Sequence, residues 1–415
     1  MPNCDAMAGA FPNACRSSAS TALRWAPRCT RRCAVWCSPS PSSPTCSSTN
    51  CWPGLPGQQR FLIVCRATSG PAKAPSPTRR CFMLSLSKTL AALLLCGAAS
   101  LAQAAETAIC YNCPPEWADW GTQLKAIADS TGVQVPLDNK NSGQALAQIV
   151  AEQAAPVADV VYYGVTFGLQ AQKAGVVDTY KPKHWDDIPA GLKDPQGHWF
   201  AIHSGTLGIM VNVDALGGLP VPQSWADLLK PEYKSMVGYL DPSSAFVGYV
   251  SAVAINQAMG GTLDNFGPAI DYFQKLAKNS PIVPKQTAYA RVLSGELPIL
   301  VDYDFNAYRA RYKDKANVAF VIPKEGTIGV PYVMSMVAKA PHRANAEKVL
   351  DFVLSDEGQA LWAKAYLRPV RSTMPADVAA QFLPDSDYAR AGVVDYQHMA
   401  AVQEAFAARY LREVK

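Results

Sequence analysis

One segment between a predicted strand and a predicted helix, Asp241-Pro-Ser-Ser-Ala-Phe-Val-Gly-Tyr249, has the composition of an anion-binding turn. The amides in the first turn of a helix have no partner within the helix, and the dipole is positive at this end, so anions bind there. Ser243 and Ser244 would add two hydroxyl donors, and Tyr249 follows. The alternative is that one serine only caps the helix, a position that serine favours.

Small polar residues follow other predicted strands as well. In an open α/β sheet ligands bind outside the carboxyl ends of the strands, so we expect these turns to meet at one crevice. The candidate ligand-binding residues that they contribute are Asn112, Ser142, Gly143, Tyr163, Thr166, Ser204, Gly205 and Thr206.

Asp302 and Tyr303 end a further apolar strand. A carboxylate at that place could pair with a ligand amine, or it could be a solvated loop acid or a partner for Arg309. The sequence holds no GxSxG, no GxxxxGK[ST] and no HExxH motif, and its histidines lack metal-ligand spacing. We therefore predict a ligand site with no catalytic residue, no metal and no cofactor.

Apolar periodicity predicts the elements that position these residues. In the first part of the folded chain, strands and helices alternate, which predicts an α/β fold with a mainly parallel sheet covered by helices. The predicted strands cover 108–111, 133–137 and 158–163, and the predicted helices cover 117–131, 142–155 and 166–174. Farther along, strands are expected over 205–212, 236–240, 297–303, 318–322 and 332–338, and helices over 225–229, 245–259, 264–277, 344–354, 357–365 and 395–411.

Residues 83–104 have the pattern of a secretory signal peptide. A short start with one lysine precedes an apolar core, and Ala102-Gln-Ala104 has the small residues that signal peptidase requires. The apolar stretch is shorter than the roughly 20 residues that span a bilayer. We expect cleavage near Ala104 and export to the periplasm.

Residues 1–82 differ from the remainder, since they hold 9 of the 12 cysteines and 11 of the 32 prolines. We interpret them as a wrongly assigned start; a disordered extension or a cysteine-rich metal domain are the alternatives. Residues 105–415 carry 27 Lys and Arg against 32 acids, so no nucleic-acid partner is indicated. Cys110 and Cys113 could form a disulfide, be two small buried residues or, least favoured, be a redox pair.

Several segments together resemble the periplasmic solute-binding proteins of ABC transporters, in the type II fold group. The segments that carry this resemblance are Ala158-Asp-Val-Val, Ala174-Gly-Val-Val, Gly205-Thr-Leu-Gly-Ile-Met-Val-Asn, Pro222-Gln-Ser-Trp-Ala-Asp-Leu, Gly295-Glu-Leu-Pro-Ile, Ile322-Pro-Lys-Glu-Gly and Ser355-Asp-Glu-Gly-Gln after the helix 344–354.

The resemblance implies two α/β lobes, each with a mainly parallel sheet, joined by crossover strands around a ligand cleft. The first lobe would comprise 105–203 and 327–375, the second 204–326, and 376–415 would form C-terminal helices that pack back across them. It further implies a monomer without enzymatic activity that binds a small molecule and meets an ABC permease and its ATPase.

The resemblance leaves several ligand classes open. Iron binders of this group have a His, a Glu and a Tyr pair where this chain has about Pro115, Gly164 and Asp302-Tyr303-Asp304, which disfavours ferric ion. Serine-rich helix starts favour an anionic group. The sequence therefore favours an organophosphonate or phosphate ester such as 2-aminoethylphosphonate, with its amine held by Asp302. Polyamine, thiamine or ferric ion are the alternatives, and a secreted enzyme on a two-lobed fold is a more distant one.

Overall fold

The computed structural model describes residues 106–371 and 373–415. The predicted extension, 1–82, and the predicted signal peptide, 83–104, lie outside the described residues and stay predictions.

The described strands pair in the order β1-β2-β8-β4-β6-β5, with β3 and β10 beside β8 and with β7 and β9 beside β4. Their bounds are β1 Cys110–Tyr111, β2 Val160–Gly164, β3 Val177–Asp178, β4 Phe200–Asn212, β5 Val237–Tyr239, β6 Ile299–Tyr303, β7 Val318–Val321, β8 Thr327–Val337, β9 Arg368–Pro369 and β10 Ala391–Gly392.

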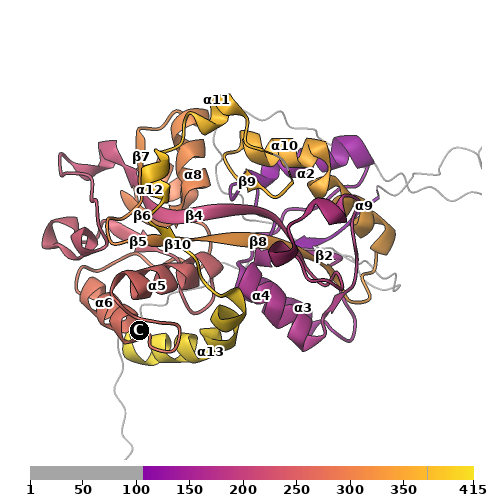
Figure 1. The fold of residues 1–415 in the computed structure, drawn as a ribbon, viewed down its shortest axis with the longest axis horizontal. Helices are drawn as coiled ribbons and strands as arrows, with labels where there is room; N and C mark the ends of the chain where they lie inside the picture. The colour runs from indigo at the N-terminus through magenta and orange to yellow at the C-terminus, as the bar shows by residue number, and fades with distance from the viewer. Residues whose placement is uncertain (1–105, 372) are drawn as a thin grey trace, which may run out of the picture. The chain divides into compact units, whose positions relative to one another are not determined.

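Two long strands, β4 and β8, connect the two halves of the molecule and cross its middle in Figure 1. The first part of β4 pairs with β8, and its last part pairs with β6 and β7. The far part of β8 pairs with β2 and β3. We call the half built on β1, β2 and β3 the first lobe, and the half built on β5, β6 and β7 the second lobe.

The sheet is more mixed than the sequence predicts. β1 runs parallel to β2, and β5 runs parallel to β6, as expected within each lobe. However, β8 is antiparallel to β2, and β4 is antiparallel to β6, β7 and β8. The reason is that the two connecting strands enter both lobes, and strand periodicity carries no information about their direction.

Helices cover both lobes. The first lobe carries α2 Trp120–Thr131, α3 Ser142–Ala151, α4 Val165–Ala174, α9 Arg343–Leu354 and α10 Asp356–Lys364. The second lobe carries α5 Phe246–Ala258, α6 Gly267–Ala277, α7 Tyr289–Leu293 and α8 Asp304–Tyr308. The C-terminal part forms α11 Ala376–Ala379, α12 Asp385–Tyr388 and α13 Tyr396–Glu413, of which α13 packs against α4 and α6 and so contacts both lobes.

Every predicted helix and strand except one has a counterpart in the structure, and the largest differences in boundary are the earlier starts of β4 at Phe200 and of β8 at Thr327. The segment 133–137 is no strand; it makes one isolated bridge between Gln134 and Thr107, because Pro136 has no amide to donate to a ladder. Helix α2 begins three residues later than predicted, because Ala118 and Asp119 have φ angles of 52° and 53° and are not helical.

The predicted lobe boundaries remain a prediction. The boundary at 203/204 falls inside β4, and the one at 326/327 falls at the first residue of β8. Both strands belong to the sheet of each lobe, so they are the segments about which a hinge motion would turn.

Candidate functional site

A cavity lies between the two lobes. The first lobe lines it with Asn112, Pro114, Trp117, Lys140, Asn141 and Ser142, the second lobe with Leu240, Ala245, Phe246, Val247, Gln286 and Thr287, and β8 with Tyr332. Its volume is about 30 Å³, which accommodates about two water molecules. A solute of several heavy atoms therefore enters only when the lobes separate or the lining side chains move.

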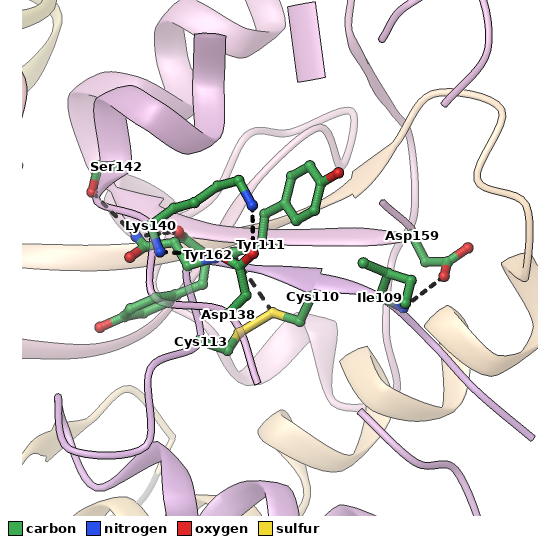
Figure 2. The surroundings of a disulfide bond; sticks show 10 residues. Ile109, Cys110, Tyr111, Cys113, Asp138, Lys140, Ser142, Asp159 and Tyr162 are labelled. Atoms are coloured by element: carbon green, nitrogen blue, oxygen red, sulfur yellow. Dashed lines mark hydrogen bonds and ion pairs between the residues drawn. A yellow bond between two sulfur atoms is a disulfide. The ribbon is translucent and has the colours of Figure 1, made fainter. Parts of the chain in front are cut away.

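A disulfide shapes the first-lobe wall. Cys110 and Cys113 are bonded, so the first of the alternatives left by the sequence is the one in the structure (Figure 2). Between them, Asn112 has a φ of 64°, a left-handed conformation that asparagine adopts more readily than most residues. Its Nδ2 donates to the carbonyl of Tyr162 at 2.7 Å, and its amide donates to Asp138 Oδ1 at 2.9 Å. The loop thus holds the Asn112 side chain at the cavity.

The start of α3 forms the next part of this wall. Asn141 and Gln144 make a capping box, in which each side chain accepts from the other's amide. Ser142 Oγ accepts from the Gly164 amide at 3.3 Å and from Asn112 Nδ2 at 3.5 Å. A hydroxyl that accepts keeps its own proton to donate, so Ser142 can donate to an oxygen of a solute.

The start of α5 faces the same cavity from the second lobe. Its N-cap residue, Ala245, makes no side-chain cap, and Phe246 and Val247 in the first turn line the cavity. Thr287 lies beside them, and its Oγ1 accepts from the Tyr289 amide at 3.3 Å, which leaves the hydroxyl proton to donate. An uncapped helix start next to free hydroxyl donors suits an anion.

The charge of the lining is also suited to an anion. Lys140 is the one charged residue among the described residues that line the cavity, and no Asp or Glu is among them. Its Nζ is paired with Asp138 Oδ2, so the ammonium group is partly neutralised (Figure 2). The anion would therefore depend on neutral donors as well as on this lysine.

An aromatic wall completes the cavity. Trp117, Phe246 and Tyr332 line it, with ring centroids of Tyr332 5.9 Å from Trp117 and 5.3 Å from Phe246. Tyr303 lies one layer behind, 5.9 Å from Trp117 and 5.7 Å from Tyr332. These rings offer contact to the carbon part of a solute.

The two lobes touch directly around the cavity. On one side, the Gly143 amide donates to the Ser244 carbonyl at 3.0 Å, and Asn141 Nδ2 donates to the Lys285 carbonyl at 2.7 Å. On another side, Lys313 Nζ is 2.6 Å from Asp119 Oδ2. The structure therefore has the closed arrangement of the cleft.

Four of the predicted binding residues lie at this closed cleft. Asn112 and Ser142 line the cavity, and Gly143 and Ser244 meet across it. Ser243 and Ser244 are not among the residues that line the cavity, however. Ser243 Oγ donates to Asp241 Oδ1 at 2.6 Å, and Ser244 Oγ accepts from Asn141. Neither caps α5, because the helix begins only after Ala245.

Three further predicted residues lie in the core. Side chains alternate between the two faces of β2. Tyr162 therefore points toward Trp117, whereas Tyr163 points to the opposite face and donates to Ser335 Oγ at 2.8 Å. Tyr249 donates to the Met399 carbonyl at 2.8 Å, because only the first turn of the buried helix α5 reaches the cavity. Thr166 is fully buried.

The residues Ser204, Gly205 and Thr206 lie on β4 and do not line the interlobe cavity. Ser204 pairs with β8 and β9, and a Cβ on Gly205 would overlap the ring of Phe305. Thr206 lines a separate cavity of about 520 Å³ and donates its amide to Asp304 Oδ1 at 3.0 Å. The long strand carries these residues past the cleft, which the pattern of small residues could not show.

Asp302 and Tyr303 are fully buried behind the aromatic wall. Asp302 Oδ1 accepts from the Tyr303 amide at 2.7 Å, and Oδ2 accepts from Asn306 Nδ2 at 3.1 Å. Burial raises the pKa of Asp302 to about 7. The carboxyl group is thus sealed inside the second lobe and not presented to a ligand amine.

The raised pKa gives a testable pH dependence. Between about pH 4 and pH 7 folded Asp302 retains a proton that the unfolded chain releases, so its contribution to the free energy of unfolding falls as the pH rises through that window. We expect Asp302→Asn to gain stability relative to the wild type from pH 5 to pH 8, by a few kcal/mol at about 1.4 kcal/mol per pKa unit. Urea denaturation at the two pH values measures this.

The matched control for that comparison is Asp186→Asn, which changes an exposed aspartate. Burial lowers the pKa of His203 to about 3. The contribution of His203 to the free energy of unfolding therefore rises with pH below about 6.5, opposite in sign to that of Asp302. This pH dependence is common to both proteins and cancels in the difference. Equal pH profiles for wild type and Asp302→Asn would contradict the assignment.

Several lining residues escape the sequence patterns. Asn141 with Gln144 three residues on is a capping signal that could have marked the start of α3. Gln286, Thr287 and Tyr332 carry no local signal, because they reach the cavity only through packing of the second lobe and of β8.

Within 106–371 and 373–415, no helix is long and apolar enough to cross a membrane. In the same part of the chain, no group of three or more His, Cys, Asp or Glu is placed to hold a metal ion.

Known proteins resemble this chain over most of its described part. The family described as bacterial extracellular solute-binding protein matches residues 155–401. A Haemophilus influenzae protein named "Uncharacterized protein" is 33% identical over 255 residues, 58% of this chain and 70% of that protein. A Salmonella typhimurium protein named "Putative 2-aminoethylphosphonate-binding periplasmic protein" is 24% identical over 264 residues, 61% of this chain and 75% of that protein.

The fold has solved counterparts. The periplasmic binding protein P5PA superposes with a TM-score of 0.64 at 23% identity, covering 75% of this chain and 100% of that one. The predicted two-lobed α/β fold of the type II periplasmic binding proteins is thereby confirmed.

Proposed function

Because the chain belongs to the bacterial extracellular solute-binding protein family, we propose that it is the periplasmic substrate-binding component of an ABC importer. It captures a small solute between its lobes and delivers it to a permease that is driven by an ATPase. The solute class is an organophosphonate or a phosphate ester, of which the sequence suggests 2-aminoethylphosphonate as one example. The protein acts as a monomer, without a cofactor and without enzymatic turnover.

One observation carries the ligand class. The uncapped start of α5, the donor hydroxyls of Ser142 and Thr287, and Lys140 converge on a cavity whose described lining contains no carboxylate. Backbone amides and hydroxyls that point at one place bind a tetrahedral oxyanion with charge-assisted hydrogen bonds. The phosphonate in the name of the Salmonella relative is consistent with this class.

The rival solutes are cations, and the lining does not favour them. A polyamine, thiamine or ferric ion would lose its hydration on entering the cavity, and the described lining residues offer it no anionic partner in return. Transfer of a charge without a partner costs several kcal/mol or more. A secreted enzyme would need an acid, base or nucleophile at the cavity, and the charged lining residue is a lysine already paired with Asp138.

A thermal-shift screen tests the class directly. We expect the melting temperature to rise with ethylphosphonate or glycerol 3-phosphate and to stay unchanged with putrescine, thiamine or ferric citrate. A ligand at 100 times its Kd adds about 2.7 kcal/mol of stability. A rise with a cation alone would overturn the anion assignment.

The site is tested by Thr287→Val, which removes a lining hydroxyl and keeps the side-chain shape. A hydrogen bond to a charged group contributes about 1.5–3 kcal/mol, so calorimetry should show ethylphosphonate affinity reduced roughly tenfold or more. The matched control is Thr179→Val at an exposed threonine away from the cavity. Equal affinities of both variants would remove Thr287 from the site.

A further inference from the structure

We infer that the cavity selects an anionic solute without an ammonium group, so that it prefers an alkylphosphonate to the aminoalkylphosphonate of the same length. This inference rests on the proposed function and sharpens its substrate class. It departs from the example that the sequence suggests and from the name of the Salmonella relative.

The residue expected to hold an amine is not accessible to one. Asp302 is 0% exposed, and both of its oxygens accept hydrogen bonds, from the Tyr303 amide and from Asn306 Nδ2. Tyr303 lies between this region and the lining, in ring contact with Trp117 and Tyr332. An ammonium group in the cavity therefore does not reach Asp302 in the closed arrangement.

The other carboxylates nearby are also engaged. Asp138 pairs through Oδ2 with Lys140 Nζ and accepts through Oδ1 from the amides of Asn112 and Lys140, as Figure 2 shows in part. Asp241 Oδ1 accepts from Ser243, and its Oδ2 is 2.7 Å from Lys415 Nζ. An ammonium group would have to displace Lys140 from Asp138, or Lys415 from Asp241, to gain an anionic partner.

The ammonium group would also meet Lys140. A solute bound between the lobes meets Lys140 as the one charged residue of the described lining, and this residue is a cation. Like charges repel, although the ion pair with Asp138 partly neutralises this lysine. The phosphonate group interacts favourably with Lys140 and with the start of α5, whereas an ammonium group interacts unfavourably with both.

Aromatic rings can bind an ammonium group through their faces, so the wall must be considered. Tyr332 stacks on Tyr162 with 5.1 Å between centroids, and Trp117 packs its ring against Tyr303 and Phe305. Trp117, Phe246 and Tyr332 are at most 6% exposed. The rings are thus occupied with one another, and what they present to a solute is an apolar surface that suits an alkyl chain.

A matched pair of probes tests the inference. Ethylphosphonate and 2-aminoethylphosphonate share the phosphonate and the two-carbon chain and differ in the ammonium group. We expect calorimetry at pH 7.5 to give a Kd for ethylphosphonate at least about tenfold lower. Equal or tighter binding of 2-aminoethylphosphonate overturns the inference while leaving the proposed function in place. Binding of neither phosphonate nor of glycerol 3-phosphate overturns the proposed function and the inference with it.

A second variant checks that the preference has the stated origin. Gln286→Glu places a carboxylate of the same shape in the lining and should shift the ratio of the two Kd values toward 2-aminoethylphosphonate by at least about fivefold. Gln153→Glu makes the same charge change at an exposed position of the first lobe and should leave the ratio unchanged. An unchanged ratio in Gln286→Glu, with both variants folded by circular dichroism, overturns the electrostatic basis of the inference.

Discussion

Gly143→Ala is expected to weaken ethylphosphonate binding by at least about tenfold and to leave the protein as stable as before. A Cβ at this position would overlap the carbonyl oxygen of Ser244 in the second lobe, and a backbone oxygen can withdraw only if the lobes move apart. The closed form is the one that surrounds a solute. A penalty of about 1.4 kcal/mol on closure already lowers the affinity tenfold.

The fold of the first lobe should tolerate the same methyl group. Gly143 lies in the first turn of α3 without a positive φ, and alanine favours a helix over glycine by up to about 1 kcal/mol. We therefore expect an unchanged or slightly higher melting temperature together with the lost affinity. A defect in folding would lower both, so the two measurements separate a blocked closure from a damaged protein.

Small-angle X-ray scattering measures the closure itself. The radius of gyration of the wild type should fall when ethylphosphonate is added, and that of Gly143→Ala should fall less. Gly191→Ala is the matched control, because nothing lies within 4 Å of the Cβ that it would gain. If Gly143→Ala binds and closes like Gly191→Ala, the contact with Ser244 does not limit closure.

The sequence predicts the elements better than their pairing. Regular apolar spacing predicts a helix over 245–259, and α5 covers Phe246–Ala258. An apolar run predicts a strand over 332–338 but not its start at Thr327. Pairing direction depends on which strand lies beside which, and no local pattern contains that information.

The site shows the same limit at the scale of single residues. Composition predicts Ser243 and Ser244 in the turn before α5 as donors, whereas the cavity is lined by Ala245, Phe246 and Val247, which follow them. Ser243 donates its hydroxyl to Asp241 within the turn, and the helix starts only after Ala245, so that Phe246 and Val247 of its first turn line the cavity. If the start of a helix shifts by two or three residues, different residues line the cavity. Helix boundaries predicted from sequence are commonly wrong by that many residues.

Arg368→Ala is expected to lower the free energy of unfolding by about 3 kcal/mol, the lower part of the range for breaking a buried ion pair. Its Nη1 is paired with Asp304 Oδ2, and Asp304 is 0% exposed. Thr206 and Tyr388 also donate to that carboxylate. Without the arginine, the buried Asp304 carboxylate keeps only neutral partners. We expect this unpaired charge to destabilise the variant more than the lost packing of the guanidinium on the Tyr388 ring does.

This pair joins parts of the chain that are far apart in sequence. Asp304 begins α8, Arg368 lies on β9 beside the connecting strand β4, and Tyr388 ends α12. Loss of the pair should therefore loosen the C-terminal segment from the region of the hinge. Hydrogen exchange is expected to rise in α12 as well as around β9, which a purely local defect would not cause.

The control is Arg343→Ala, which removes a solvent-exposed ion pair. Arg343 pairs with Asp178, and the two side chains are 43% and 45% exposed. Surface pairs contribute at most about 1 kcal/mol, so this variant should unfold close to the wild type in urea. The double variant Asp304→Asn with Arg368→Met removes both charges and should recover much of the stability that Arg368→Ala loses, because no unpaired charge stays buried. If the double variant is as unstable as Arg368→Ala, the loss comes from packing around Arg368 and not from the unpaired carboxylate.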